Sequence, residues 1–196
     1  MTRTLRGEAK LDYLLEKGME VLWSKGYNGT SVNDIVRAAG IPKGSFYFYF
    51  ESKEDFTIKA LYRYSDLEFA PALEILQNQA VSPKQRLLDF YEYRIKTLKE
   101  EFNCRMGCMA CNLSSEMSEH NDNIRKAVVD IQNKMTQPII AAAREAQEQG
   151  EIDSSINIPD LIKFLEDAGK GAMISMKEMQ SAYPIDNVMN MIKKLF

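Results

Sequence analysis

One short stretch, residues 40–56 (GIPKGSFYFYFESKEDF), constrains the fold more strongly than any other part of the sequence. Its opening glycine can adopt a positive φ and end a preceding helix, and Pro42 suits the first turn of a new one, where no backbone donor is needed. Phe46 and Phe50 are four residues apart, so a helix over residues 43–50 places both on an inward face. The outward side and its flanks then carry basic, small polar and aromatic residues: Lys43, Ser45, Tyr47, Phe48 and Tyr49.

Helix-capping pairs stand on both sides of this short helix. Upstream, Ser31 and Asp34 predict the start of a helix with an apolar side. Downstream, Ser52 followed by Asp55 predicts the start of the next one. A helix, a glycine turn and an exposed helix in this order indicate a helix-turn-helix, in which the second helix reads DNA.

At these positions the chain resembles the TetR family of bacterial transcriptional regulators. The matching pattern is Thr30-Ser31-x-x-Asp34-Ile35, Ala38-Ala39-Gly40-Ile41 and Lys43-Gly44-Ser45-Phe46-Tyr47-x-Tyr49-Phe50-x-Ser52-Lys53-Glu54. The resemblance implies an all-α protein with a helix-turn-helix DNA-binding domain over residues 1–52 and a ligand-binding and dimerisation domain over residues 53–196. It also implies a ligand- or redox-responsive repressor that binds a palindromic operator as a homodimer.

The resemblance further assigns the DNA contacts. Five residues are expected to face the major groove: Lys43, Gly44, Ser45, Tyr47 and Tyr49. Thr30 and Lys53 are expected to hold phosphates, although the Thr30 hydroxyl could equally cap the second helix. Arg3 and Arg6 are further local candidates for phosphate contacts. Phe48 is more apolar than this position usually is in the family, which bears on base preference.

The charge balance gives DNA binding no support of its own. The chain has a formal net charge of −3, and residues 1–56 contain eight Lys or Arg and eight Asp or Glu. Salt screens surface charges beyond about 8–10 Å, so the placement of a few cations matters more than the sum. An interaction protein with a non-functional helix-turn-helix therefore stays open as an alternative.

The sequence gives little support to other broad classes of protein, namely secreted proteins, membrane proteins and enzymes. Charged residues interrupt the N-terminus where a secretory signal needs an apolar core, and no apolar run approaches the ~20 residues of a membrane helix. Three cysteines, an odd number, do not suit a secreted disulfide framework, so we expect a cytoplasmic protein. With one histidine, no phosphate-binding loop and no nucleophile motif, we expect no enzyme, no catalytic residues and no cofactor.

Apolar residues recur at helical spacing along the whole chain, and no segment alternates as a strand would. Helices are therefore expected over residues 6–25, 52–79, 83–102, 107–117, 121–149 and 160–181, with a short terminal helix from residue 184. Pro71 is expected to kink or break the long helix that contains it. Gly26 and Gly150 are expected to end theirs.

The last two long helices carry apolar seams suited to close pairing. One seam consists of Ile124, Val128, Ile131, Met135 and Ala142. The other consists of Leu161, Leu165, Ala168, Ala172, Met176 and Met179. The family pairs these helices with their twins in a four-helix interface, so the resemblance implies a homodimer through them. Packing inside a single chain is the alternative.

A second informative stretch contains all three cysteines, at positions 104, 108 and 111. The spacing Cys-x3-Cys-x2-Cys is that of the radical-SAM iron–sulfur motif, but that motif belongs to an α/β barrel and no strands are expected here. A zinc site that adds His120, the only histidine, would have an unusual spacing. Inert packing of buried thiols is the plainer interpretation, so a metal or iron–sulfur protein stays an alternative only.

A third interpretation of the cysteines rests on resemblance. Gly107-Cys108, followed by Asn112-Leu113-Ser114-x-Glu116-Met117-Ser118, is similar to the branch of the family that includes the electrophile-sensing N-ethylmaleimide repressor. This implies that Cys108 is a sensing thiol and Lys177 its cationic neighbour. A nearby ammonium lowers a thiol pKa and favours the reactive thiolate. Cys104 and Cys111 depart from this pattern and either resolve an oxidised Cys108 or do nothing.

The family also places a ligand cavity between its regulatory helices, in this region of the chain. The candidate walls are aromatic, basic and methionine residues: Phe90, Tyr91, Tyr93, Arg94, Met106, Met109 and Met117. Ordinary core packing is the alternative for each of them. The expected partners are operator DNA, a second copy of the chain and a small-molecule or electrophile effector, without a membrane.

Overall fold

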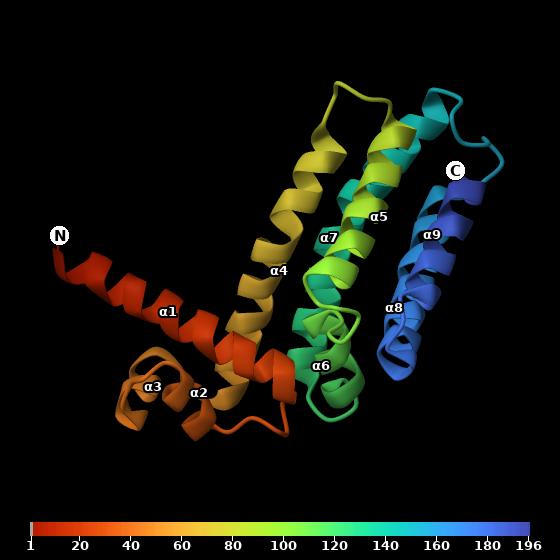
Figure 1. Ribbon diagram of the computed structural model, residues 1–196. Coiled ribbons are helices and arrows are strands. Elements are labelled where there is room, and N and C mark those ends of the chain that lie inside the picture. Colours follow the sequence, from red (N-terminus) through yellow and green to blue (C-terminus); the bar gives the residue numbers. More distant parts are fainter. Residues whose placement is uncertain (1) are drawn as a thin grey trace. The chain divides into compact units, whose positions relative to one another are not determined.

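The computed structural model describes the backbone of residues 2–196 and the side chains from Ala9 onward. Over these residues the chain forms nine helices and no strand, which confirms the predicted all-α class (Figure 1). The helices are α1 (Thr2–Lys25), α2 (Val32–Ala38), α3 (Lys43–Tyr49), α4 (Lys53–Gln77), α5 (Pro83–Glu100), α6 (Met109–Met117), α7 (Asp122–Glu148), α8 (Ile158–Met179) and α9 (Tyr183–Leu195).

The sequence predicted a kink or a break at Pro71, and the break is absent. A proline inside a helix removes one backbone hydrogen bond, yet α4 continues to Gln77. Ala72 and Leu76 lie beyond the proline and are buried, so core packing holds this part of the helix in place. The helix predicted over residues 107–117 begins only at Met109, because the residues before it form turns and a loop.

The chain divides into two compact units, and the first consists of Met1–Leu67 with Met109–Ile131. Phe46 and Phe50 are both buried there, as predicted, with ring centroids 5.1 Å apart. Phe56 of α4 packs on both rings, at 5.9 Å from Phe46 and 5.1 Å from Phe50. Helix α1 can pass close to this aromatic core because Gly18 has no side chain: a Cβ there would lie 2.5 Å from the Phe56 ring.

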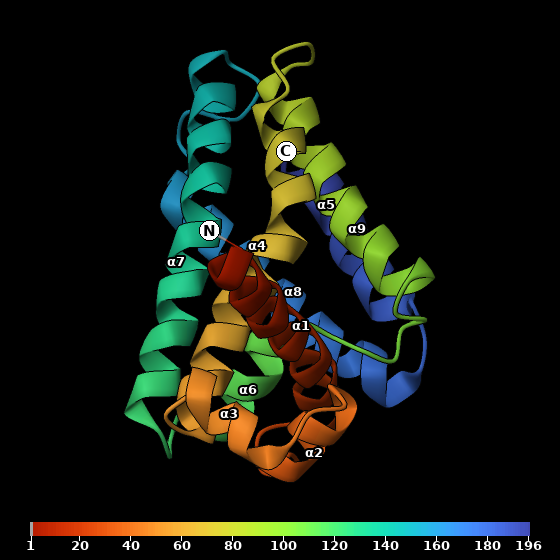
Figure 2. The same cartoon turned by 90° about the vertical axis from the view of Figure 1, so that its left-hand side faces the viewer.

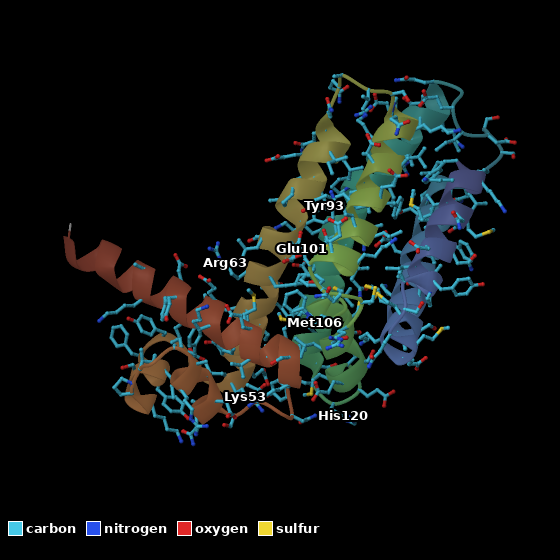
Figure 3. The ribbon with its side chains drawn as sticks, viewed as in Figure 1. Lys53, Arg63, Tyr93, Glu101, Met106 and His120 are labelled. Atoms are coloured by element: carbon cyan, nitrogen blue, oxygen red, sulfur yellow. The ribbon has the colours of Figure 1, made fainter. Side chains whose placement is uncertain are left out.

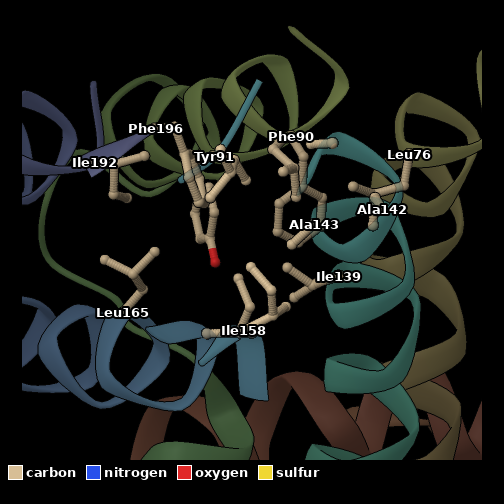
Figure 4. Packing of buried hydrophobic residues seen from close by; sticks show 14 of the residues in the cluster. Leu76, Phe90, Tyr91, Ile139, Ala142, Ala143, Ile158, Leu165, Ile192 and Phe196 are labelled. Atoms are coloured by element: carbon tan, nitrogen blue, oxygen red, sulfur yellow. The ribbon is translucent and has the colours of Figure 1, made fainter. Parts of the chain in front are cut away.

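The second unit consists of Glu68–Cys108 with Gln132–Phe196. Helix α9 packs against both α5 and α8 (Figure 2). Aliphatic and aromatic side chains from all the helices of this unit form one buried cluster (Figure 4). At its edge the buried Arg86 guanidinium pairs with Glu145 at 2.6 Å and donates to the Leu76 carbonyl at 3.2 Å. These contacts tie α4, α5 and α7 together.

Helix α6 and the first turns of α7 belong to the first unit although they are far from α1, α2 and α3 in the sequence. The division of function between residues 1–52 and residues 53–196 stays a prediction.

Candidate functional site

A capping box fixes the start of α2. The Ser31 hydroxyl accepts the Asp34 N–H at 3.2 Å, and the Asp34 carboxylate accepts from the Ser31 N–H at 3.0 Å and from its hydroxyl at 2.5 Å. These hydrogen bonds, first the one from the Ser31 hydroxyl, lower the pKa of Asp34 to about 2. Gly40, with a φ of 64°, then turns the chain toward α3. The capping pair and the turn glycine act as the sequence predicted.

The side of α3 away from the aromatic core is open. Tyr47 is 56% exposed and Phe48 is 82% exposed. The other predicted groove-facing residues are exposed or half-buried on the same helix: Lys43, Gly44, Ser45 and Tyr49. The sequence-based list left out Phe48, the most exposed large apolar residue in the described part of the chain. The sequence did contain a signal for this exposure: Phe48 is two residues from both Phe46 and Phe50, so it lies on a different side of the helix from these buried rings.

Gly44 is a glycine that the fold itself does not require. Its φ is not in the left-handed region, and a Cβ built on it would meet no atom within 4 Å. Glycine inside a helix costs about 0.5–1 kcal/mol relative to alanine. The bare backbone at the start of α3 therefore leaves room for the close approach of another molecule.

Both side chains that were predicted to contact phosphates form hydrogen bonds within the first unit. Thr30 is 1% exposed, and its hydroxyl donates to the Gly26 carbonyl at 2.7 Å. The predicted cap by Thr30 is therefore wrong, since Ser31 caps α2. The Thr30 side chain is too buried to reach a phosphate. Lys53, labelled in Figure 3, donates to the carbonyls of Tyr27 at 2.9 Å and Thr30 at 3.0 Å. The same ammonium also lies over the Tyr27 ring, 3.9 Å from its centroid.

The side chains of Arg3 and Arg6, the other candidate phosphate contacts, lie outside the described residues.

Glu116 of α6 holds the same loop between α1 and α2, and sequence reasoning missed it. Its carboxylate accepts the N–H groups of Tyr27 and Asn28, each at 2.7 Å. Gly26 lies directly beneath, with a φ of 73°, and a Cβ there would be 2.6 Å from the carboxylate. Lys53 on the carbonyls and Glu116 on the N–H groups thus form a clamp on the loop that positions α2. No local pattern marks Glu116, because its partners are almost ninety positions away.

A second polar link joins the start of α4 to the start of α7. Glu54 accepts from the side-chain amides of Asn121 at 2.6 Å and Asn123 at 2.7 Å. These hydrogen bonds, first that from Asn123, lower the pKa of Glu54. The side-chain oxygen of Asn121 accepts the Ile124 N–H at 2.9 Å and so caps the start of α7.

Cys108 and Lys177, the pair implied by the resemblance, lie in one part of the second unit. A Cβ added to Gly107 would lie 3.7 Å from both Cδ and Cε of Lys177. The lysine stem therefore passes over the residue that precedes the half-buried Cys108. Nearby Glu68 has a raised pKa, caused first by burial and then by the charges of Glu101 and Cys108.

The other two cysteines occupy different settings. Cys104 lies in the loop after α5, with a φ of 56°, and Cys111 lies on α6 in the first unit. No disulfide joins any of the three cysteines within the described residues. Among the side chains that the structure describes, no group of three His, Cys, Asp or Glu could hold a metal ion. Nothing here favours the iron–sulfur or zinc alternative.

A cavity of about 40 Å³ lies in the second unit between α5, α8 and α9. Tyr91 and Arg94, two of the predicted walls, line it together with mainly aliphatic residues such as Leu165 and Met173. Phe90 is instead buried in the neighbouring hydrophobic cluster, against which Tyr93 also packs.

The three predicted methionine walls are wrong for this cavity. Met109 and Met117 are buried in the first unit, where the Met117 sulfur accepts a hydrogen bond from Asn28 at 3.8 Å. Met106, labelled in Figure 3, is half-buried in the loop before α6. Helical spacing marked all three as apolar positions but could not say which core each one joins.

The polar groups of the cavity come from α5 and α8. Arg94 donates to Glu166 at 2.7 Å, with side chains 30% and 15% exposed. Burial alone would lower the pKa of Arg94, but the charge of Glu166 and its hydrogen bond, with smaller effects of Tyr91 and Cys108, together raise this pKa above its usual value. Tyr91 is 5% exposed, and its hydroxyl has no hydrogen-bond partner among the described residues. Burial, and then the charge of Glu166, raises the pKa of Tyr91, so the hydroxyl keeps its proton.

Known proteins resemble this chain over nearly its whole length. Residues 14–60 match a family model described as bacterial regulatory proteins, tetR family, and residues 83–192 match one described as tetracyclin repressor-like, C-terminal domain. The HTH-type transcriptional repressor DhaR of Mycobacterium sp. is 35% identical over 182 residues, which cover 92% of this chain and 88% of that protein. This chain belongs to the TetR family.

Two further TetR-family proteins extend the comparison. The repressor NemR of Escherichia coli is 25% identical over 188 residues, 94% of this chain and 92% of that protein. A crystal structure of NemR described as its reduced form has a TM-score of 0.84 at 24% identity and covers 95% of this chain and 96% of that chain. The crystal structure of a regulatory protein TetR from Rhodobacter sphaeroides has a TM-score of 0.85 at 28% identity. The match covers 94% of this chain and 97% of that chain.

These similarities confirm the predicted family and the class of DNA-binding transcriptional regulator. In the described part of the chain, no helix combines the length and apolar character needed to cross a membrane.

Proposed function

We propose that this chain is a homodimeric transcriptional repressor that binds a palindromic operator through the exposed side of α3. It leaves the operator when Cys108 is modified or when an effector binds in the second unit. The observation that carries the proposal is the open aromatic and basic side of α3, held on a capped and clamped helix-turn-helix frame. DhaR and NemR are described as repressors, which supports repression over activation. A regulator of this kind acts on DNA in the cytoplasm and needs no catalytic residue.

The side chains of α3 differ in what they can contact on DNA. Lys43 suits a phosphate or a guanine edge, whereas Ser45 and Tyr47 can hydrogen-bond either bases or phosphates, and Tyr49 supports them from the flank. Phe48 has no polar side-chain atom, so its exposed ring favours the methyl group of thymine.

Gly44 and Lys53 contribute in another way. The absence of a side chain at Gly44 lets a phosphate approach the start of α3. Lys53 fixes the loop between α1 and α2, and its positive charge attracts a phosphate that approaches this loop. Thr30 is not part of this proposal, because its hydroxyl is buried.

Tyr47→Ala tests the reading face, with Tyr13→Ala as a matched control, since Tyr13 is an exposed tyrosine on α1. Loss of a base contact typically weakens binding by roughly 5- to 150-fold. Fluorescence anisotropy with a fragment of the chain's own promoter should show this loss for Tyr47→Ala and none for Tyr13→Ala. Binding should also fall steeply with salt. Unchanged affinity of Tyr47→Ala would refute the assignment of the face.

The dimer interface that we propose differs from the one expected from the sequence. Ile124, Val128 and Ile131 of α7 are buried within the chain, so that seam is not available to a second copy. Exposed apolar side chains are found instead on α8 and α9: Phe164, Ile174, Met179, Tyr183 and Met191. The interface we propose therefore pairs α8 and α9 with their twins, which corrects the predicted use of α7.

The sensing role that we propose for Cys108 rests on Lys177, whose stem passes over the preceding residue, Gly107. A cation near a thiol favours the thiolate, which is the form that reacts with electrophiles. NemR, which is similar to this chain over nearly its full length, has a structure described as a reduced form. Alkylation of Cys108 adds bulk in a half-buried site and removes the thiolate charge, and both changes disturb the packing of α8 over residue 107.

N-ethylmaleimide is a direct probe of this role. It should release the wild-type protein and the Cys104→Ser and Cys111→Ser variants from promoter DNA, whereas Cys108→Ser should stay bound. Lys177→Met should react more slowly because the thiolate loses its cationic neighbour. Release of Cys108→Ser by the reagent would place the sensing site elsewhere.

A further inference from the structure

Phe48 is an exposed aromatic residue whose ring is nevertheless held in place from behind. The residue is 82% exposed, and its ring packs edge-to-face on that of Tyr49, with centroids 5.0 Å apart and an interplanar angle of 88°. The Tyr49 ring in turn lies 6.5 Å from that of Phe50, and the Phe50 ring lies 5.1 Å from that of Phe56. A row of four rings therefore runs from the aromatic core of the first unit to the surface of α3, and it ends at Phe48.

The ring of Phe48 is open toward the start of α3. Side chains of a helix lean toward its N-terminus, so Phe48 leans over the turn that contains Gly44, four residues earlier. Gly44 has no side chain, and a Cβ built on it would meet no atom within 4 Å. A single exposed apolar residue is normal on a protein surface. This one is already ordered by its aromatic neighbours, so little side-chain freedom is lost when a partner packs on the ring.

The surroundings of the ring define that partner as a base edge of DNA. In a helix-turn-helix regulator the second helix, here α3, enters the major groove. Every base pair presents hydrogen-bond donors and acceptors there, and the one apolar group is the C5-methyl of thymine. A phenyl ring over a donor or acceptor would leave it without a partner, which costs free energy. The same ring over a methyl group removes apolar surface from water.

A contact of this kind detects a methyl group and not a base pair. The side chain of Phe48 has no polar atom, so it cannot distinguish thymine from cytosine by hydrogen bonding. A methyl group on C5 of cytosine projects into the major groove from the same ring position as the methyl group of thymine. Uracil and unmodified cytosine lack this group. The two methylated pyrimidines should therefore bind to the ring alike, and the two unmethylated ones should both bind less well.

We propose that Phe48 is a methyl-reading residue, which packs on a pyrimidine C5-methyl group in the operator whether this group belongs to thymine or to 5-methylcytosine. Methylation of a cytosine at that position then strengthens binding, so that base methylation is a further input to the regulator beside its effector. The inference rests on the proposed function, in which α3 lies in the major groove. It goes beyond that function because it assigns to the chain a sensitivity to a modified base.

The test uses the full-length protein and a fragment of its own promoter, followed by fluorescence anisotropy at a fixed salt concentration. Thymines are first replaced one at a time by deoxyuridine, which removes the methyl group and keeps the base pairing. At the position so identified, the T·A pair is then replaced by C·G, with and without a C5-methyl group on the cytosine. Each protein is described by the ratio of its affinities for the methylated and unmethylated base, in which a general loss of affinity cancels.

The wild type should prefer thymine over uracil by about two- to fivefold at one position of each half-site, as expected for one buried methyl group. It should prefer 5-methylcytosine over cytosine there by a similar factor. Phe48→Ala should bring both ratios close to one, and it should fold normally because the residue is mostly exposed. Phe48→Leu, which keeps an apolar side chain, should retain part of each ratio. Tyr13→Ala, an exposed tyrosine on α1, is the control and should leave both ratios unchanged.

Three results would overturn the proposal: a wild type that is insensitive to every thymine-to-uracil replacement, a Phe48→Ala protein that keeps both ratios, or equal affinity for 5-methylcytosine and cytosine. A Phe48→Ala protein that binds more weakly but keeps its ratios would show that the ring packs on the sugar or between bases. All of these results require a wild type that binds its promoter. Failure of the proposed function would instead appear as the absence of salt-dependent promoter binding, with or without the methyl groups.

Discussion

Gly26 and Gly40 offer a matched pair of substitutions that tests the clamp on the loop between α1 and α2. Both glycines have left-handed backbone, with φ of 73° and 64°. Alanine at either position incurs a backbone strain of about 1–2 kcal/mol. At Gly40 a Cβ meets nothing within 4 Å, so strain is the whole cost. At Gly26 the Cβ would lie 2.6 Å from the Glu116 carboxylate, which must move off the two N–H groups it holds.

The size of the second effect follows from those two hydrogen bonds. A hydrogen bond to a charged group contributes about 1.5–3 kcal/mol, and leaving a buried partner unmet costs a similar amount. Asn28 is exposed and its N–H can return to water, so we assign the pair about 2–3 kcal/mol in total. Gly40→Ala should therefore lower the free energy of unfolding by about 1–2 kcal/mol and Gly26→Ala by about 3–5 kcal/mol.

Urea unfolding at a fixed protein concentration measures these differences. Adding Glu116→Ala closes a double-mutant cycle. Because Gly26→Ala already displaces the carboxylate, the double variant should be no less stable than Gly26→Ala itself, although the separate costs sum to about 5–8 kcal/mol. Equal costs for the two glycine substitutions, or an additive cycle, would show that Glu116 does not hold the loop.

Two further predictions concern pH and assembly. The pKa of Asp34 is about 2 when folded, below its ordinary value of 3.8, so its contribution to stability is complete above about pH 4 and is lost as the pH falls toward 2. Asp34→Asn should therefore be less stable than wild type at pH 7, with a difference that closes between about pH 4 and pH 2 in pH-dependent unfolding; a constant difference would contradict the pKa shift. Phe164→Glu on α8 should give monomers in light scattering at micromolar concentration, whereas Val129→Glu on α7 should stay dimeric. The reverse result would move the interface to α7.

The sequence predicted the parts of the molecule that depend on local patterns. Phe46, Phe50 and the capping pair of Ser31 and Asp34 follow from spacing along one or two turns of helix, and the structure places them as expected. Of the kink or break expected at Pro71, the break is absent, because helix propensity is a local preference and the buried residues beyond the proline override it.

The contacts between distant residues could not be predicted in this way. Glu116 and Gly26 are brought together only by the packing of α6, and no local sequence pattern around either residue predicts this contact. Lys177 was placed near Cys108 only through the family resemblance. The methionine predictions failed for the related reason that a helical period identifies a buried face but not its partner. Tyr91 and Arg94 both line the cavity, but the sequence could not show that Arg94 pairs there with Glu166, because the two residues are far apart along the chain.

The central claim, that DNA lies against the exposed side of α3, is tested most directly by Gly44→Ala. The fold does not need a glycine there, so alanine should raise the free energy of unfolding by about 0.5–1 kcal/mol. The added methyl group would stand where the DNA backbone approaches, so promoter affinity at a fixed salt concentration should fall. A variant that is more stable and binds more weakly agrees with the account. A variant that is more stable and binds its promoter as tightly as the wild type contradicts it.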